Sequence, residues 1–372
     1  MLRAAALADL YLSGDLTDER GRAVIDDRRR CHDRVLAAVL DEIAGARPRK
    51  PGSETYGRPC AGGYRDVACG ISGHKASEGQ LLVSQEPGNY APANGIQLWY
   101  RDEGPQTGEP VLLIMGLGSQ LIAWPEDFVT DLVGRGYRVI RFDNRDCGLS
   151  DKIEPPAVPT FRPAYFLTDM ANDAIGLLDH LGIDRAHVVG ASMGGMIAQL
   201  VAINHPTRVS SLCSIMSTTG NRLVGLPTQE AVRAVLAPTP TEREAAIEHM
   251  AGVISVIGSK TLAKTEWPRR IEYAAAAYDR GIFPAGTVRQ FDAIAAAVDR
   301  TSRLQQLDVP TLVIHGDEDS LINISGGAAT AAAIPGARFE QSPTMGHDLP
   351  HSLCGGLVEA IEANFSRALA PA

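Results

Sequence analysis

The chain has 372 residues, of which 45% are hydrophobic and 21% charged, and its net charge is −9 at pH 7. This length and apolar content suit a globular protein with one large domain or two ordinary ones. The acidic surplus lies after residue 87 and argues against nucleic-acid binding, and no apolar run approaches the roughly 20 residues that cross a bilayer.

The first 87 residues form an extension that differs from the rest of the chain. A partial apolar stripe predicts helix over residues 17–45. The stretch 47–79 is rich in Gly, Pro and Ser and has no period, which indicates loop or disorder. We find no motif here that carries chemistry, and a regulatory or partner-binding arm is the alternative to a passive extension.

From about residue 90 onward, predicted strands alternate with predicted helices. Asn94-Gly95 precedes an alternating strand, which is typical of a β-hairpin. Apolar runs predict strands and helical spacing predicts helices, in the order strand 109–118, helix 124–136, strand 137–143, helix 166–182, strand 186–192, helix 193–206 and strand 209–218. This alternation requires a mostly parallel sheet covered by helices on both faces.

The alternation pauses between about residues 219 and 305, a stretch that is Ala-rich and has helical spacing. It resumes with a strand at 309–319, a helix at 326–336, a strand at 337–342 and a last helix at 352–369. An insert within a parallel α/β domain usually covers the carboxyl ends of the strands, where ligands bind. We therefore interpret residues 219–305 as a helical cap, inserted before a late strand of the domain 88–372.

Ser192 is the first candidate for catalysis, because the G-x-S-x-G pattern of Gly190, Ser192 and Gly194 stands between a predicted strand and a predicted helix. A sharp strand-to-helix turn exposes a serine hydroxyl above the sheet and leaves no room for side chains at the flanking glycines. The alternative is a small residue in a Gly-rich turn. The surrounding strand and helix favour a nucleophile.

A nucleophile that attacks a carbonyl carbon needs backbone N–H donors aimed at the developing oxyanion. The N–H of Met193, directly after Ser192, is one candidate. The turn "IMGLG" at 114–118 follows a strand and offers the N–H of Leu117 as the second. Taken alone, this turn is equally typical of an ordinary strand-to-helix connection.

An acid and a base are expected downstream. Three carboxylates, Asp317, Glu318 and Asp319, follow a strand end from which one of them can reach an imidazole. Among nine histidines, His347 lies in a Gly-preceded loop between a late strand and the last helix, and His351 is its competitor. We expect His315, at a strand end, to be a packing residue. The order serine, acid, histidine is that of one hydrolase fold.

With these motifs, residues 88–370 resemble the α/β-hydrolase fold superfamily. The stretch 115–152 is similar to serine esterases grouped with aclacinomycin methylesterase and non-haem haloperoxidase-like hydrolases, which carry a "FDNRDxGxS" turn after the second parallel strand. Here that turn comprises Phe142, Asp143, Asn144, Arg145, Asp146, Gly148 and Ser150. We expect it to tie loops together near the site.

The resemblance implies a role for each candidate. The acid three residues after the glycine of "HGxxD" corresponds to Asp319, and the base of the "GH" motif corresponds to His347. The oxyanion donors correspond to Leu117 and Met193. Many relatives have His-Gly at the oxyanion turn, where this chain has Met115-Gly116; a backbone donor survives that change, although the residue lining the hole differs.

These residues predict a serine hydrolase that cleaves a small-molecule carboxylic ester through an acyl-enzyme, with no metal and no organic cofactor. A serine at the elbow disfavours the Asp-dependent dehalogenases and epoxide hydrolases and the Cys-dependent dienelactone hydrolases of this fold. Lactonase, carbon–carbon bond hydrolase, perhydrolase and acyltransferase activities use the same three residues and stay open. A non-catalytic binding module is the rival from another class.

The six cysteines are scattered and include no C-x-x-C pair, so neither a disulfide framework nor a zinc site is expected. The N-terminal residues show no signal peptide. Together these features predict a cytoplasmic protein without a membrane span. Aromatic residues that could line a substrate pocket, or belong to the core, are Trp124, Trp267, Tyr273, Tyr278, Phe283 and Phe291.

Overall fold

The computed structural model describes residues 16–19, 22–25, 86–154 and 162–369. The chain divides into two units, Leu2–Glu86 and Pro87–Ala372. Within the described ranges, no helix combines the length and the apolar character needed to cross a membrane.

The described part of the first unit is a pair of antiparallel strands, β1 (Leu16–Glu19) and β2 (Arg22–Ile25). The predicted helix over 17–45 is therefore wrong for these residues, and its remainder lies outside the described ranges, as does the stretch 47–79. β-branched residues such as Thr17, Val24 and Ile25 favour extended backbone.

The second unit is built on an eight-stranded sheet with the order β10-β9-β8-β7-β5-β6-β4-β3. Strands β3 and β4 are antiparallel to their neighbours and all later pairs are parallel. The strands are β3 (Asn89–Ala93), β4 (Ile96–Glu103), β5 (Pro110–Ile114), β6 (Arg138–Phe142), β7 (Ala186–Ala191), β8 (Val209–Ile215), β9 (Thr311–Gly316) and β10 (Arg338–Ser342). The mostly parallel sheet predicted from the sequence is confirmed.

The hairpin joining β3 and β4 turns at the expected dipeptide. Asn94 and Gly95 have φ angles of 49° and 83°, so both adopt the left-handed conformation that a tight two-residue hairpin turn requires. Asn tolerates this conformation and Gly adopts it without strain, which explains why this pair predicted the turn from the sequence alone.

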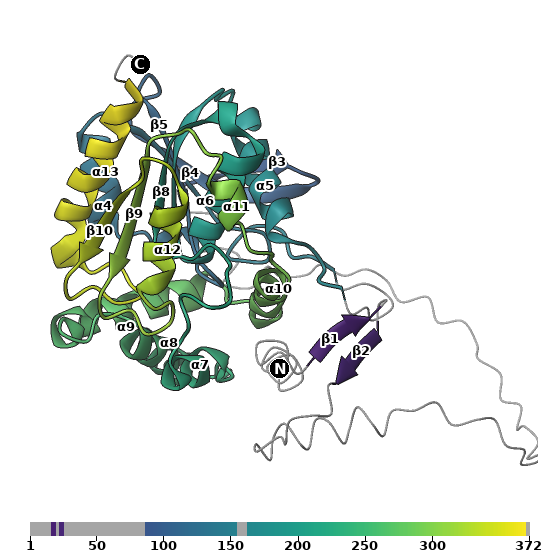
Figure 1. Ribbon diagram of the computed structural model, residues 1–372. Helices are drawn as coiled ribbons and strands as arrows, with labels where there is room; N and C mark the ends of the chain where they lie inside the picture. Colours follow the sequence, from purple (N-terminus) through teal and green to yellow (C-terminus); the bar gives the residue numbers. More distant parts are fainter. Residues whose placement is uncertain (1–15, 20–21, 26–85, 155–161, 370–372) are drawn as a thin grey trace, which may run out of the picture. The chain divides into compact units, whose positions relative to one another are not determined.

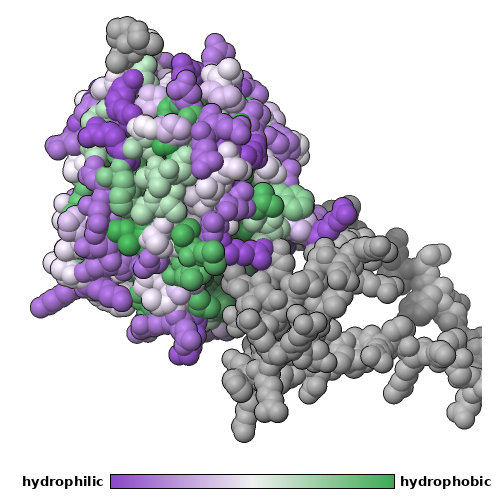
Figure 2. Space-filling model, in the orientation of Figure 1, coloured by the Kyte–Doolittle hydropathy of each residue, from purple (hydrophilic) through white to green (hydrophobic). Residues whose placement is uncertain are grey.

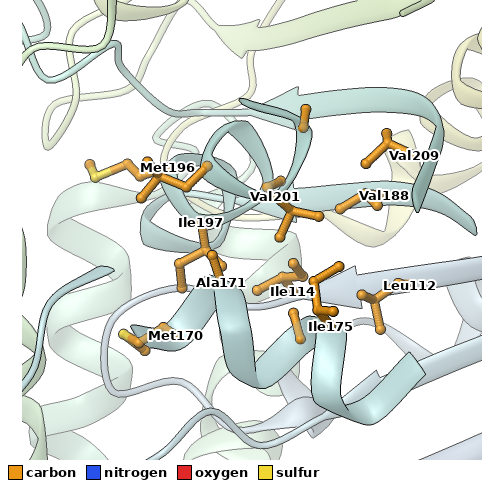
Figure 3. Packing of buried hydrophobic residues seen from close by; sticks show 14 of the residues in the cluster. Leu112, Ile114, Met170, Ala171, Ile175, Val188, Met196, Ile197, Val201 and Val209 are labelled. Atoms are coloured by element: carbon orange, nitrogen blue, oxygen red, sulfur yellow. The ribbon is translucent and has the colours of Figure 1, made fainter. Parts of the chain in front are cut away.

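Helices cover both faces of the sheet (Figure 1). One face packs against α4 (Glu126–Gly134) and α13 (Cys354–Leu369), and the other against α5 (Leu167–His180) and α6 (Met193–Asn204). Figure 3 shows the second core, in which Leu112, Ile114 and Val188 of the strands meet side chains of α5 and α6. The parallel strands β5 and β7 are almost fully buried, as expected for strands covered on both faces.

The residues predicted as a cap form a group of helices before β9: α7 (Gln229–Leu236), α8 (Arg243–Ile257), α9 (Ala263–Arg280), α10 (Pro284–Ala295) and α11 (Thr301–Leu304). α12 (Ser325–Ala333) and three short 3-10 turns, η1 (Leu121–Ala123), η2 (Pro206–Arg208) and η3 (His351–Leu353), complete the unit. Hydrophobic residues gather towards the cap end of the face drawn in Figure 2. Leu223 and Leu226, which precede α7, are exposed.

Candidate active site

Ser192 stands at a sharp turn between β7 and α6, with φ 58° and ψ −121°. This conformation is strained for a residue with a side chain, and strain of this kind concentrates at functional sites. A Cβ on Gly190 would lie 2.1 Å from the carbonyl oxygen of Gly194, and one on Gly194 would lie 2.0 Å from that of Ile114. The prediction that side chains would clash at these two glycines is confirmed.

His347 lies beside the Ser192 hydroxyl. Its Nε2 is 2.9 Å from Ser192 Oγ, and its Nδ1 is 2.7 Å from Asp319 Oδ2. An ionised carboxylate only accepts hydrogen bonds, so Nδ1 carries the proton and Nε2 is left free to accept one from the serine hydroxyl. Residues 155 and 28 positions apart in the sequence thus form one continuous hydrogen-bonded series.

Asp319 is buried, and its surroundings keep it ionised. Burial acts to raise the pKa of the carboxyl group, but the charge of His347 and hydrogen bonds from His315 and His347 outweigh it and lower the pKa to about 2. Its second oxygen accepts hydrogen bonds from the backbone N–H groups of Leu321 and Ile322, at 2.9 and 2.8 Å. Asp319 therefore has the charge and the fixed orientation needed to hold an imidazole.

The other two carboxylates of this loop have different partners. Asp317 Oδ1 accepts from the backbone N–H of Thr344 at 2.9 Å. Glu318 is bound to the chain between α8 and α9, where it accepts from the N–H groups of Lys260 and Thr261. The structure brings Asp319 alone of the three to His347.

The competing histidine is elsewhere. His351 is exposed and pairs with Asp127 at the start of α4. His315, expected as a packing residue, is fully buried, and its Nε2 lies 2.7 Å from the carbonyl oxygen of Ile322 and 3.3 Å from Asp319 Oδ2. Its contact with Asp319 was missed, although its position four residues before the acid at a strand end was the available signal.

The turn carrying Leu117 passes directly over Ser192. A Cβ on Gly116 would lie 3.0 Å from Ser192 Cβ and 3.4 Å from its Oγ, so the glycine permits this close approach. Leu117 is the next residue, and Met193 begins α6, where the first N–H groups of a helix have no intrahelical partner. Both sequence-predicted donors therefore belong to segments that border the hydroxyl.

The "FDNRDxGxS" turn ties this region to the cap. Asp143 is fully buried, accepts from the N–H groups of Leu121 and Leu149, and pairs with Arg280 of α9 at 2.9 Å. Asp146 pairs with Arg289 of α10 through two 2.8 Å hydrogen bonds. The loop-tying role expected for this turn agrees with these contacts, but the cap arginines that complete it were not predicted.

The loop of His347 is also bound to the cap. The N–H of His347 donates to the carbonyl oxygen of Ile257 at 2.9 Å. Its two neighbours share one partner, because Ser259 Oγ accepts from the N–H of Gly346 and donates to Asp348. Arg270 of α9 then pairs with Asp348 at 2.9 Å. Sequence patterns gave no sign of these contacts, since the partners lie roughly 80 to 90 residues apart.

The candidate pocket aromatics have varied surroundings. Trp124 is fully buried and packs on Phe128, with ring centroids 5.2 Å apart, so it belongs to the core. Trp267 is 41% exposed, and the Tyr278 hydroxyl donates to the carbonyl oxygen of Thr241. Burial raises the pKa of the Tyr273 hydroxyl, and Ser119 acts against this effect.

The remaining two aromatics are on the segment before α10 and within it. The Arg289 guanidinium lies over the ring of Phe283, 5.3 Å from its centroid. Phe291 is half-buried in α10. Among the described residues, no group of three or more His, Cys, Asp or Glu side chains is arranged to hold a metal ion.

Residues 109–351 match the family model described as the alpha/beta hydrolase fold. The chain is 29% identical over 289 residues to rhodomycin D methylesterase of Streptomyces peucetius, covering 72% of this chain and 95% of that protein. It is 31% identical over 268 residues to 2-hydroxymuconate semialdehyde hydrolase of a Pseudomonas species, strain CF600. This match covers 71% of this chain and 88% of that protein.

Among solved structures, the enol-lactonase of Burkholderia xenovorans LB400 is similar, with a TM-score of 0.62 and 25% identity. The match covers 75% of this chain and all of that one. The resemblance predicted from the sequence is confirmed. The chain belongs to the α/β hydrolase fold family and is a hydrolytic enzyme.

Proposed function

We propose that the protein hydrolyses carboxylic esters through an acyl-enzyme formed on Ser192. One observation carries the proposal: the series Ser192–His347–Asp319, with hydrogen-bond distances of 2.9 and 2.7 Å. A serine hydroxyl is a poor nucleophile unless a positioned base takes its proton, and this series supplies such a base together with a carboxylate that orients it.

In the first half of the reaction, Ser192 Oγ attacks the ester carbonyl carbon while its proton passes to His347 Nε2. The N–H groups of Leu117 and Met193 stabilise the oxyanion of the tetrahedral intermediate. Collapse of the intermediate breaks the bond to the alcohol oxygen, and the alcohol leaves with the proton held by His347. Asp319 stays ionised throughout and stabilises the imidazolium.

In the second half, a water molecule gives a proton to His347 Nε2 as its oxygen attacks the acyl carbon. The second tetrahedral intermediate releases the carboxylic acid and returns the proton to Ser192 Oγ. The protein groups used in these steps all belong to the proposed domain 88–372, which includes the proposed cap at about 219–305. The steps require no metal or organic cofactor.

The relatives support ester chemistry. One is named a methylesterase, and a similar solved structure is an enol-lactonase, whose substrate class is an internal ester. Lactonase activity is therefore the second candidate, and it uses the same steps. Turnover of a panel of nitrophenyl esters with different chain lengths, beside methyl esters and lactones, separates the two by comparing kcat/KM.

The nucleophile is tested with Ser192→Ala. We expect loss of ester turnover and loss of covalent labelling by a fluorophosphonate, with an unchanged circular dichroism spectrum. Ser210→Ala, at the opposite end of β8 from the site, is the control and should label like the wild type. Labelling of the Ser192→Ala variant would refute the assignment, and an unlabelled wild type would favour a binding module.

The extension 1–87 is tested by limited proteolysis. We propose that it is not part of the catalytic machinery, so cleavage within it should leave ester turnover at the wild-type rate. A fall in kcat that follows the cleavage would instead support a regulatory arm.

A further inference from the structure

Gln290 of α10 is a side chain of the helical insert that hydrogen-bonds to the oxyanion turn. It is fully buried, although a glutamine side chain is rarely buried without hydrogen-bond partners. Its Oε1 accepts from the backbone N–H of Gly118 at 2.7 Å, and its Nε2 donates to the carbonyl oxygen of Arg145 at 2.7 Å. The two partners determine the orientation of the amide, because an N–H only donates and a carbonyl only accepts.

Gly118 is the last residue of the oxyanion turn. The first part of that turn, at Met115, is held by the residue next to Arg145. Asn144 Nδ2 donates to the carbonyl oxygen of Met115 at 2.9 Å. Leu117, the proposed oxyanion donor, lies between these two anchored residues. Gly118 itself has φ 63° and packs against α10, since a Cβ there would lie 2.8 Å from the Thr287 hydroxyl. The turn therefore has little freedom to rotate the Leu117 N–H.

Helix α10, which carries Gln290, is itself held by the same "FDNRDxGxS" turn. Arg289 makes two 2.8 Å hydrogen bonds to Asp146, directly after the residue whose carbonyl Gln290 binds. Three consecutive residues, 144–146, thus bind the oxyanion turn, Gln290 and Arg289 respectively. This closed set of contacts joins the cap, the "FDNRDxGxS" turn and the oxyanion turn.

We infer that Gln290 is a positioning residue for the oxyanion hole: it holds the 115–118 turn so that the Leu117 N–H faces the oxyanion. The inference rests on the proposed function and extends it, because it makes the cap part of the catalytic apparatus. A preorganised donor acts on charge that develops in the transition state and has little to bind in the ground state. Losing its positioning should therefore lower kcat and leave KM nearly unchanged.

Gln290→Met is the direct test, since methionine has similar length and makes neither hydrogen bond. Loss of a whole oxyanion donor costs on the order of 10²–10³ in rate, so a displaced donor should lower kcat by roughly tenfold to a hundredfold. Inhibition by a trifluoromethyl ketone, which forms an oxyanion on Ser192, should weaken by the same factor. Inhibition by the matching alcohol, which forms none, should stay unchanged.

Gln199→Met is the matched control. Gln199 is equally buried and has two side-chain partners, Ser214 and Arg300, neither of which belongs to the oxyanion turn. It should lower the thermal unfolding midpoint while keeping kcat and the ketone-to-alcohol inhibition ratio. If both variants lower kcat equally, Gln290 has a general structural role and the inference is wrong.

Gln290→Glu keeps the test available where the methionine variant folds poorly. When ionised, its carboxylate retains an acceptor for the Gly118 N–H and loses the donor to Arg145, so its kcat should fall below that of the wild type. An unchanged kcat in every Gln290 variant that folds overturns the inference alone, provided that the wild type labels with a fluorophosphonate. A wild type that does not label overturns the proposed function, and this inference with it.

Discussion

The two sides of the candidate site are built in different ways. The nucleophile side is contiguous in sequence: β7, the turn at Ser192 and α6 span residues 186–204, and two glycines make the turn possible. The acid–base side comes from the loops after β9 and β10. There, Asp319 and His347 are 28 residues apart, and contacts from the chain between α8 and α9 hold their loops.

This difference arises because the chain between α8 and α9 holds the loops of Asp319 and His347. The segment 257–261 contacts both loops: Lys260 and Thr261 bind Glu318, and Ser259 binds the neighbours of His347 on either side. The geometry at Ser192 therefore depends on local sterics, whereas the geometry at Asp319 and His347 depends on long-range packing of the helices between β8 and β9.

Asp319→Asn should have the largest effect, on the acid–base side. An amide at this position favours the wrong imidazole tautomer, and the corresponding change in serine proteases lowers kcat by about 10⁴. We expect a loss of that order in ester turnover with KM little changed. Asp317→Asn is the control, since Asp317 binds the N–H of Thr344 and does not touch His347. Equal losses in both variants would contradict the assignment of the acid.

Gly194→Ala tests the nucleophile side. Its Cβ would lie 2.0 Å from the carbonyl oxygen of Ile114, so the elbow must shift by a substantial fraction of an ångström. A misplacement of about 1 Å can cost roughly 10² in rate, and we expect a fall of that order in kcat. Gly252→Ala in α8, where a Cβ meets nothing within 4 Å, should retain wild-type turnover.

The stability that Asp319 contributes should depend on pH. Its pKa is about 2 in the folded protein against 3.8 as the ordinary value, so its ionised form contributes about 2 kcal/mol. Because the folded pKa is the lower one, this contribution is present above about pH 4 and is lost as the pH falls towards 2. Urea unfolding of wild type and Asp319→Asn, compared at several pH values, measures it as the change in their difference. A constant difference would contradict the lowered pKa.

Ser259→Ala should have the smallest effect and tests the cap contact. It removes the hydroxyl that binds Asp348 and the Gly346 N–H, each a hydrogen bond with a typical net contribution of about 1 kcal/mol. We expect kcat to fall by about threefold to tenfold with KM unchanged. Ser366→Ala in α13 is the control. Full activity of Ser259→Ala would mean that the base loop holds its position without the cap.

The sequence predicted most of the fold because its signals are local. Asn94-Gly95 marked the hairpin of β3 and β4, and the alternation of apolar runs with helical spacing located the parallel sheet and the helical stretch between β8 and β9. The paired strands β1 and β2 were missed because four-residue strands are too short for a period to emerge. For the site, the glycines around Ser192 and the loop position of His347 were informative, whereas the family pattern was needed to choose Asp319.

The contacts that position the site were not predictable in this way. Gln290 lies 172 residues from Gly118, and the sequence around it reads as an ordinary Ala-rich helix. Ser259, Arg280 and Arg289 are likewise polar residues of the cap with no motif of their own. Their partners are determined by how the cap packs on the sheet.

What the residues decided by themselves is therefore the bend that exposes one hydroxyl, since glycine is the residue that fits two backbones so close together at Gly190 and Gly194. What the tertiary structure decided is which groups surround this hydroxyl. The imidazole of His347 lies 2.9 Å away, and the side-chain amide of Gln290 binds the neighbouring turn. The physical reason is that the two kinds of interaction act over different separations in the sequence. Steric exclusion acts between adjacent residues, whereas hydrogen bonds between distant segments exist only after burial of the cores has brought those segments together.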